Sequence, residues 1–231
     1  MHKIWEYAGY NRHTDVKLTI RGKSIKGDSL VEYNPIYNEI VVDSFKLKKD
    51  NFHNIIDIIQ KYKIKYIHGY PSLLKELMDY CKYFKLHFQL KGIFLGSEGS
   101  SVDEKSVLQN FFQCQVVSWY GQTEKITLAI DHSSNGVYRV FTSYGLPGIH
   151  NPDEHGFGEI TGTTFINKAL PIIKYRTGDY GNLIKNKHVY LTNIQGRWGK
   201  DFIFLNHDKK IPTTSINLHS PIQNEILFYQ I

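Results

Sequence analysis

Apolar residues recur at helical spacing in three stretches of the first half of the chain. The spacing predicts helices over about 51–62, from about Tyr70 to Phe84, and over about 101–112. The third helix has a capping-box pattern, because Ser101 is followed three residues later by Glu104. These three periods are the strongest secondary-structure signals in the sequence.

Short apolar runs precede the second and third helices, and another follows the third. They lie at about 65–69, 92–96 and 114–117, and each is bounded by polar residues or glycine. Strands that alternate with helices in this way are typical of βαβ units, which build a parallel sheet. In residues 1–50 we find only short alternating runs, such as Val16–Ile20, and no catalytic constellation.

The pattern changes to period two after about residue 120, which predicts a β-rich region over 135–212. Asn135-Gly136 is a hairpin signal. The expected strands lie over 137–141, 156–165, 171–176, 180–184, 188–194 and 202–205. We therefore expect an α/β fold, with a parallel-sheet α/β part over residues 1–134 followed by a β-rich subdomain over 135–214.

Composition narrows the class of protein without identifying it. The chain has 231 residues, of which 41% are hydrophobic, so it can form a real core. Its net charge is +6, but the lysines are scattered along the sequence, which favours a solvated surface over nucleic-acid binding. Cys81 and Cys114 lie in apolar contexts without metal-ligand spacing, and we expect both to be reduced core residues. No apolar run is long enough to span a bilayer and no signal-peptide core is present, so we expect a cytoplasmic protein without membrane or nucleic-acid partners.

The stretch Ser118–Glu124, after the run 114–117, has the residue types of a phosphate site. Gly121 permits a backbone turn where a side chain would collide. The Thr123 hydroxyl can donate to a phosphate oxygen, and the Glu124 carboxylate can hold Mg²⁺ together with phosphates. Without other information, the stretch is equally compatible with an ordinary strand-to-turn junction.

Several motifs in order carry a family resemblance. Tyr120–Glu124 resembles the Tyr-Gly-x-Thr-Glu motif of the adenylate-forming ligases, and Tyr175–Asp179 resembles their Tyr-Arg-Thr-Gly-Asp motif. Gly196-Arg197 with Asp201 is similar to their Gly-Arg-x-x-Asp motif. Upstream, Gly69–Leu74 resembles a Gly-Tyr-Pro-Ser-x-Leu segment of the branch that contains phenylacetate-CoA ligase and the capsule-biosynthesis CapK type.

The resemblance implies an ATP-dependent ligase that converts a carboxylate to an acyl-adenylate and then to a coenzyme A thioester. In that case Thr123 would contact the α-phosphate and Glu124 would hold Mg²⁺. Asp179 would accept hydrogen bonds from the ribose hydroxyls, and Arg197 would contact the ribose or a phosphate. Asp179 and Arg197 could also be ordinary surface residues.

The resemblance also implies further binding residues. Tyr120 and Gly121 would belong to the nucleotide site, and Gly96, Ser97 and Glu98 would line the adenine pocket, although the latter three also fit a plain strand-to-helix turn. His68 and Tyr70 would lie near the carboxylate substrate, because ligands of α/β sheets bind outside the carboxyl ends of strands. Structural packing is the alternative for both.

The chain also departs from the family pattern. Thr161–Thr164 looks like the family's phosphate loop, but Phe165 stands where an open backbone needs glycine, so we expect an ordinary strand. We find no match to that loop in residues 1–68, and 215–231 would be only a hinge or the start of a C-terminal domain. We therefore expect a ligase fragment with weak or no activity alone, to which a second chain could supply missing segments. A non-catalytic remnant or partner module in capsule or surface-polysaccharide biosynthesis is the alternative.

Overall fold

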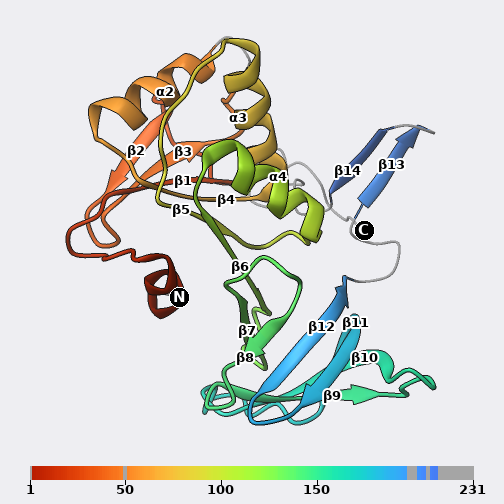
Figure 1. Ribbon diagram of the computed structural model, residues 1–231. Helices are drawn as coiled ribbons and strands as arrows, with labels where there is room; N and C mark the ends of the chain where they lie inside the picture. The colour runs from red at the N-terminus through yellow and green to blue at the C-terminus, as the bar shows by residue number, and fades with distance from the viewer. Residues whose placement is uncertain (1, 49–50, 197–201, 207–208, 213–231) are drawn as a thin grey trace, which may run out of the picture. The chain divides into compact units, whose positions relative to one another are not determined.

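The structure is a computed structural model that describes residues 2–48, 51–196, 202–206 and 209–212 (Figure 1). It divides into two compact units, one containing Met1–Val117 and Pro212–Ile231 and the other Ser118–Ile211. The domain boundaries expected after residues 134 and 214 stay predictions, and 215–231 lie outside the described residues.

The first unit is built on a mainly parallel sheet with the strand order β2-β3-β1-β4-β5. Its strands are β1 (Lys17–Arg21), β2 (Val31–Asn34), β3 (Glu39–Asp43), β4 (Tyr66–Gly69) and β5 (Gly92–Leu95). Strand β1 pairs in parallel with β3 and β4, β4 pairs in parallel with β5, and β2 is antiparallel to β3. The predicted parallel sheet is therefore confirmed. It also includes three strands from residues 1–50, of which β1 coincides with the alternating run Val16–Ile20, whereas β2 and β3 had no strong signal.

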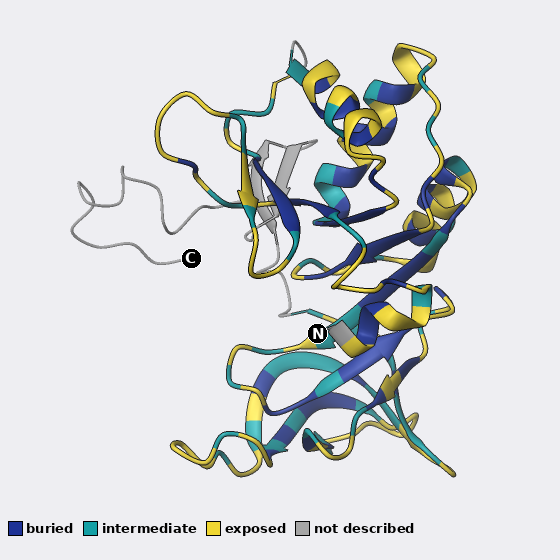
Figure 2. Ribbon diagram, turned by 90° about the vertical axis from the view of Figure 1, so that its left-hand side faces the viewer, coloured by how far each residue is buried: buried dark blue, intermediate teal, exposed yellow. Residues whose placement is uncertain are grey.

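Helices α2 (Phe52–Lys61), α3 (Pro71–Tyr83) and α4 (Val102–Phe112) match the three predicted helices within two residues at each end. Their inner faces form the main apolar core with alternate residues of the strands (Figure 2). The capping box is present, since Ser101 Oγ accepts from Glu104 N and the Glu104 carboxylate accepts from Ser101 N. Cys81 and Cys114 are unpaired and buried, and burial raises the pKa of their thiols to about 11 and about 12.

The opposite face of this sheet has a polar and aromatic layer that the periodicity did not predict. The short helices α1 (His2–Trp5) and η1 (Glu6–Ala8) bring the Trp5 ring to 5.3 Å from the Phe94 ring and 5.3 Å from the His68 ring. Beneath them, buried Lys17 Nζ lies 2.6 Å from Glu39 Oε2. A buried ion pair of this kind requires both partners, because either charge alone would be costly in an apolar interior.

The second unit is an antiparallel sheet with the strand order β6-β7-β8-β12-β11-β10-β9. Strand β6 (Gln115–Gly121) starts in the first unit and ends in the second. The others are β7 (Leu128–Asp131), β8 (Tyr138–Val140), β9 (Gly145–His150), β10 (Phe157–Thr164), β11 (Tyr175–Lys185) and β12 (Val189–Gln195). Strands β13 (Phe202–Asn206) and β14 (Lys209–Pro212) form a separate two-stranded sheet.

The β-rich prediction is confirmed in kind and corrected in detail. The Asn135-Gly136 hairpin joins β7 and β8, and the Asp131 carboxylate accepts from Gly136 N at 2.9 Å. The two strands expected over 171–176 and 180–184 are one strand, β11, and 171–174 are not part of it. Thr161–Thr164 lie in β10 as expected for an ordinary strand. Among the described helices, none has the length and apolar character needed to cross a bilayer.

Candidate functional site

The first motif, Tyr120–Glu124, follows from the way strand β6 ends. The strand is buried over 116–118 and opens toward solvent at Gly121. A Cβ at Gly121 would lie 3.2 Å from the Thr127 carbonyl oxygen, so a side chain would be crowded there. Gln122–Lys125 then form a turn closed by Lys125 N donating to Gln122 O at 3.1 Å. The turn leaves Thr123 exposed and Glu124 half-buried.

The second motif, Tyr175–Asp179, forms a bulge in strand β11. The antiparallel register with β10 shifts by two residues, since Arg176 pairs with Thr161 whereas Tyr180 pairs with Glu159. Gly178 takes φ 77°, a left-handed conformation that side chains other than glycine rarely adopt. Bulges re-aim side chains and are common beside binding sites. Here the bulge turns Asp179 toward strand β6, where Tyr120 lies.

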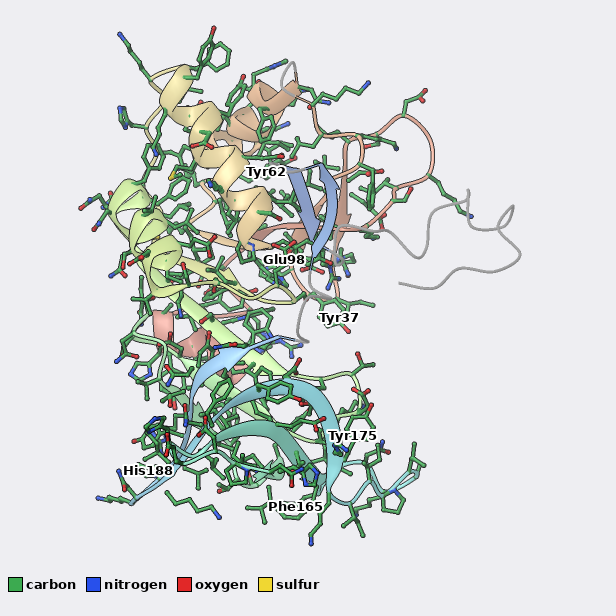
Figure 3. The ribbon with its side chains drawn as sticks, turned by 90° about the vertical axis from the view of Figure 1, so that its right-hand side faces the viewer. Tyr37, Tyr62, Glu98, Phe165, Tyr175 and His188 are labelled. Atoms are coloured by element: carbon green, nitrogen blue, oxygen red, sulfur yellow. The ribbon has the colours of Figure 1, made fainter. Side chains whose placement is uncertain are left out.

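The two motifs exchange hydrogen bonds with each other. Tyr120 Oη donates to Asp179 Oδ2 at 2.8 Å, and Tyr175 Oη, at the start of β11 (Figure 3), donates to Glu124 Oε1 at 2.8 Å. The bonded residues are 59 and 51 positions apart in the sequence. Burial raises the pKa of Tyr120 far above its usual value, and the negative charge of Asp179 raises it further. Tyr120 is therefore a neutral donor that holds one oxygen of the carboxylate.

Glu159 on β10 fixes the rest of the second motif, and the sequence reading missed it. Its Oε2 accepts from Arg176 Nε at 2.6 Å, and its Oε1 accepts from Gly178 N at 3.0 Å. Thr177 Oγ1 donates to Ile160 O at 2.7 Å and accepts from Asp179 N at 3.0 Å. Residues 176–178 thus hold the bulge, which leaves Tyr175 and Asp179 to face the first motif. Glu159 lies in the strand predicted over 156–165, but nothing in the pattern of that strand indicated that it would pair with the second motif.

The Gln122 side chain lies between the two hydrogen-bonded pairs along the chain and is half-buried. Burial and Asp179 raise the pKa of Tyr120, and a hydrogen bond with Gln122 partly offsets them. The site therefore combines two carboxylates, each oriented by a tyrosine, with an amide beside Tyr120.

The predicted adenine-pocket residues lie in the first unit, at the end of β5. Gly96 is buried and Ser97 is exposed with φ 70°. The Glu98 carboxylate accepts from Ser72 N at 3.1 Å and from Ser72 Oγ at 2.9 Å. Ser72 lies in the first turn of α3, so Glu98 caps that helix from a neighbouring loop and its charge suits the helix N-terminus. A contact with adenine stays a prediction.

The predicted carboxylate-binding residues, His68 and Tyr70, lie just before the start of α3. His68 is only 8% exposed, and burial together with nearby Arg21 and Lys17 lowers its pKa to about 3, so its imidazole is neutral. This environment favours the packing alternative for His68. Tyr70 is half-buried and is the N-cap residue of α3. The preceding Gly69 is required, since a Cβ there would lie 2.7 Å from the Ile20 carbonyl oxygen. A substrate role stays a prediction for His68 and Tyr70.

The third motif and the cation predicted at Glu124 remain to be placed. Arg197 and Asp201 of the third motif lie outside the described residues. Within the described ranges, no group of three or more His, Cys, Asp or Glu side chains is placed to hold a metal ion.

Comparison with known proteins gives a match at the level of the fold. No protein-family model and no curated protein sequence matches the chain. A solved structure of 2-hydroxyisobutyryl-CoA ligase, in the postadenylation state with R3-HIB-AMP, has a TM-score of 0.65 at 15% identity. This match covers 93% of this chain and 49% of that one. The chain has the fold of the large-domain core of adenylate-forming ligases.

Two further structures support the same architecture. An open conformation of 2-hydroxyisobutyryl-CoA ligase with 2-HIB-AMP and CoA matches 91% of this chain, and the match covers 54% of that chain, with a TM-score of 0.64 at 16% identity. Coronafacic acid ligase from Pectobacterium brasiliense has a TM-score of 0.52 at 14% identity, over 91% of this chain and 45% of that one. The chain therefore spans about half the length of the solved structures that it matches.

Proposed function

We propose that this chain supplies the nucleotide-binding core of an ATP-dependent carboxylate–CoA ligase of the adenylate-forming type. The observation that carries the proposal is the reciprocal exchange between the two motifs, in which Tyr120 holds Asp179 and Tyr175 holds Glu124. Two ordinary surface turns do not require their carboxylates to accept hydrogen bonds from tyrosines more than 50 residues away in the sequence. The ligase fold supports the proposal, since its solved examples include complexes with acyl-AMP and CoA.

The proposed chemistry has two steps. The carboxylate of the substrate attacks the α-phosphorus of ATP, which gives an acyl-adenylate and releases pyrophosphate. The thiol of CoA then attacks the acyl carbon, which gives the thioester and releases AMP. The contribution of the protein is to position the reactants and to neutralise charge at the phosphorus, as in other phosphoryl-transfer sites.

The residues of the second unit have distinct roles in this proposal. Asp179, oriented by the hydrogen bond from Tyr120 to Oδ2, would accept hydrogen bonds from the ribose hydroxyls. Thr123 is exposed in the turn and can donate to the α-phosphate. Glu124 is held at Oε1 and offers Oε2 to Mg²⁺, which would neutralise phosphate charge when bound.

The substrate class and the branch rest on the sequence. Gly69–Leu74 resembles the phenylacetate-CoA ligase branch, so we propose an aromatic or other small carboxylic acid as the acyl substrate. Tyr70 is the best candidate for a contact with it, since it is half-buried where α3 begins. His68, which is neutral and packed against Trp5, is better suited to supporting this segment than to binding a carboxylate charge.

Calorimetric titration with ATP and Mg²⁺ tests the proposal. We expect binding by the wild-type chain, loss of that binding in Asp179→Ala, and unchanged binding in Asp57→Ala, which removes an exposed carboxylate of α2. The Asp57 variant matters because a basic chain also attracts polyphosphates without a site. If the folded wild-type chain does not bind, or Asp179→Ala binds as well as wild type, the proposal is wrong and a non-catalytic module becomes the better explanation.

A further inference from the structure

A lysine-rich edge of the first unit has no part in the proposed ligase site. It consists of two segments, Lys61–Lys65 and Lys82–Lys91, which begin in the last turns of helices α2 and α3 and lead into strands β4 and β5. Lys91 N donates to Lys65 O at 2.7 Å, so the two segments meet where the parallel strands begin (Figure 1). We call them together the lysine edge.

The lysine edge is uniformly basic and exposed. Neither segment contains an Asp or Glu, and all of their lysines have exposed side chains: Lys61, Lys63, Lys65, Lys82, Lys85 and Lys91. None of the six forms an ion pair with another described residue. The other 22 of the chain's 28 Lys and Arg residues balance its 22 Asp and Glu residues, so the lysine edge alone accounts for the net charge of +6. Lysines that are scattered in the sequence are thus gathered by the fold.

Exposed aromatic side chains lie among these lysines. Tyr83 is 80% exposed, Phe84 is 52% exposed and Tyr62 is 50% exposed. Helix ends explain part of the pattern, because Lys61 and Lys82 suit the negative C-terminal ends of α2 and α3. They do not explain Lys63, Lys85 and Lys91, which lie beyond the helices, nor the exposure of half or more of each of three large aromatic rings.

We propose that the lysine edge is a docking surface for an anionic phospholipid membrane. Lysines near such a surface are attracted by the headgroup charge, and Tyr and Phe rings insert at the headgroup level. The lysine edge contains no arginine. Lysine ammonium groups suit the spread-out negative charge of lipid headgroups, whereas nucleic-acid sites favour arginine, whose planar guanidinium pairs with phosphates and guanine edges. The three rings are at least half exposed at the helix ends, while single-strand binders place theirs in a groove. The surface would hold the protein reversibly, without a membrane-spanning segment.

Vesicle co-sedimentation tests this proposal. The probes are phosphatidylcholine vesicles with and without phosphatidylserine, at physiological ionic strength. We expect the wild-type chain to bind only the phosphatidylserine vesicles. A triple variant with Lys63→Glu, Lys85→Glu and Lys91→Glu should bind them at least about 100-fold more weakly, given that each lysine near the surface contributes about 1 kcal/mol.

The matched control is a triple variant of the second unit, with exposed Lys168, Lys185 and Lys187 each changed to Glu. It has the same net charge as the first variant, and we expect it to bind nearly as well as wild type. Tyr83→Ser leaves the net charge unchanged, so a purely electrostatic attraction would be unaffected. We expect this variant to bind the vesicles more weakly than wild type, because it removes an inserting ring. Equal losses in the two triple variants, no binding by the folded wild-type chain, or binding of a single-stranded RNA oligonucleotide at this edge without vesicle binding would each overturn the proposal.

Discussion

Tyr175 donates its hydroxyl to Glu124 at 2.8 Å, across a gap of 51 residues in the sequence. The bond fixes Oε1 of Glu124, while Oε2 accepts no hydrogen bond from another described residue, so the protein itself orients the carboxylate. Orientation in advance matters in such a site, because a group that must reorganise on binding loses part of its interaction energy. The bond therefore links the second motif to the proposed cation-binding residue of the first.

Tyr175→Phe removes only this hydroxyl, so its effect should fall on the metal-dependent part of nucleotide binding. A hydrogen bond to a charged group contributes about 1.5–3 kcal/mol, so we expect ATP affinity in the presence of Mg²⁺ to fall about tenfold or more. Affinity for ATP without Mg²⁺ should change little. Calorimetry with and without the metal separates the two effects. Tyr190→Phe, at a half-buried tyrosine of β12, is the control, and equal losses with and without Mg²⁺ in Tyr175→Phe would contradict a positioning role.

Glu98 provides a second test, because it has a structural role and a proposed ligand role. Ser72→Ala removes one of its two donors and should lower the free energy of unfolding by about 1 kcal/mol, as for other helix caps. Glu98→Gln keeps an oxygen acceptor for Ser72 but loses the negative charge at the helix N-terminus, so its cost should be smaller, about 0.3–1 kcal/mol. Urea unfolding measures both changes.

The same two variants separate the structural role of Glu98 from adenine binding. If Glu98 only caps α3, then Ser72→Ala and Glu98→Gln should leave ATP affinity unchanged once both chains are folded. If the carboxylate also contacts adenine, Glu98→Gln should weaken ATP binding and Ser72→Ala should not. Comparable weakening by both would mean that the helix start itself positions the site.

The helices could be predicted from the sequence, because local periodicity determines them. Features that depend on pairing between distant strands could not be predicted. The helices that follow 51, 70 and 101 were found because their apolar stripes repeat and Ser101 caps the third. The bulge at Gly178 was not predicted, because a register shift depends on the partner strand and not on the strand itself. For the same reason Glu159 was missed: a single buried acid in an alternating strand gives no signal until Arg176 is known to lie beside it. Lys17 and Glu39, 22 positions apart, were likewise unpredictable as a pair.

That buried pair gives a prediction about stability. Burial raises the pKa of Glu39, but the hydrogen bonds from Lys17 and Thr19 outweigh it and hold the pKa below its usual value. Glu39→Gln leaves the Lys17 ammonium buried without a countercharge, and we expect a loss of about 3–5 kcal/mol in the free energy of unfolding. The double variant Lys17→Met with Glu39→Met removes both charges and should be far less destabilised. Urea unfolding of both variants checks this, and a double variant as unstable as Glu39→Gln would contradict the explanation.

His68 should make the stability of the chain depend on pH. Its pKa is lowered from 6.5 to about 3, mainly by burial, so the folded chain keeps this imidazole neutral where the unfolded chain protonates it. Because the unfolded state binds the extra proton, stability is fully present above pH 6.5 and is lost as pH falls toward 3. Between pH 6.5 and about 4.5 the loss should be about 2–3 kcal/mol.

Urea unfolding across this range, with wild type and His68→Phe, measures the slope. The Phe variant keeps a ring against Trp5. Its unfolding should take up about one proton fewer than that of wild type, so its stability should fall less steeply as the pH is lowered. His155→Gln, at a side chain that is 82% exposed, should keep the wild-type slope. A His68→Phe chain with an unchanged slope would show that other groups, and not this buried imidazole, set the acid sensitivity.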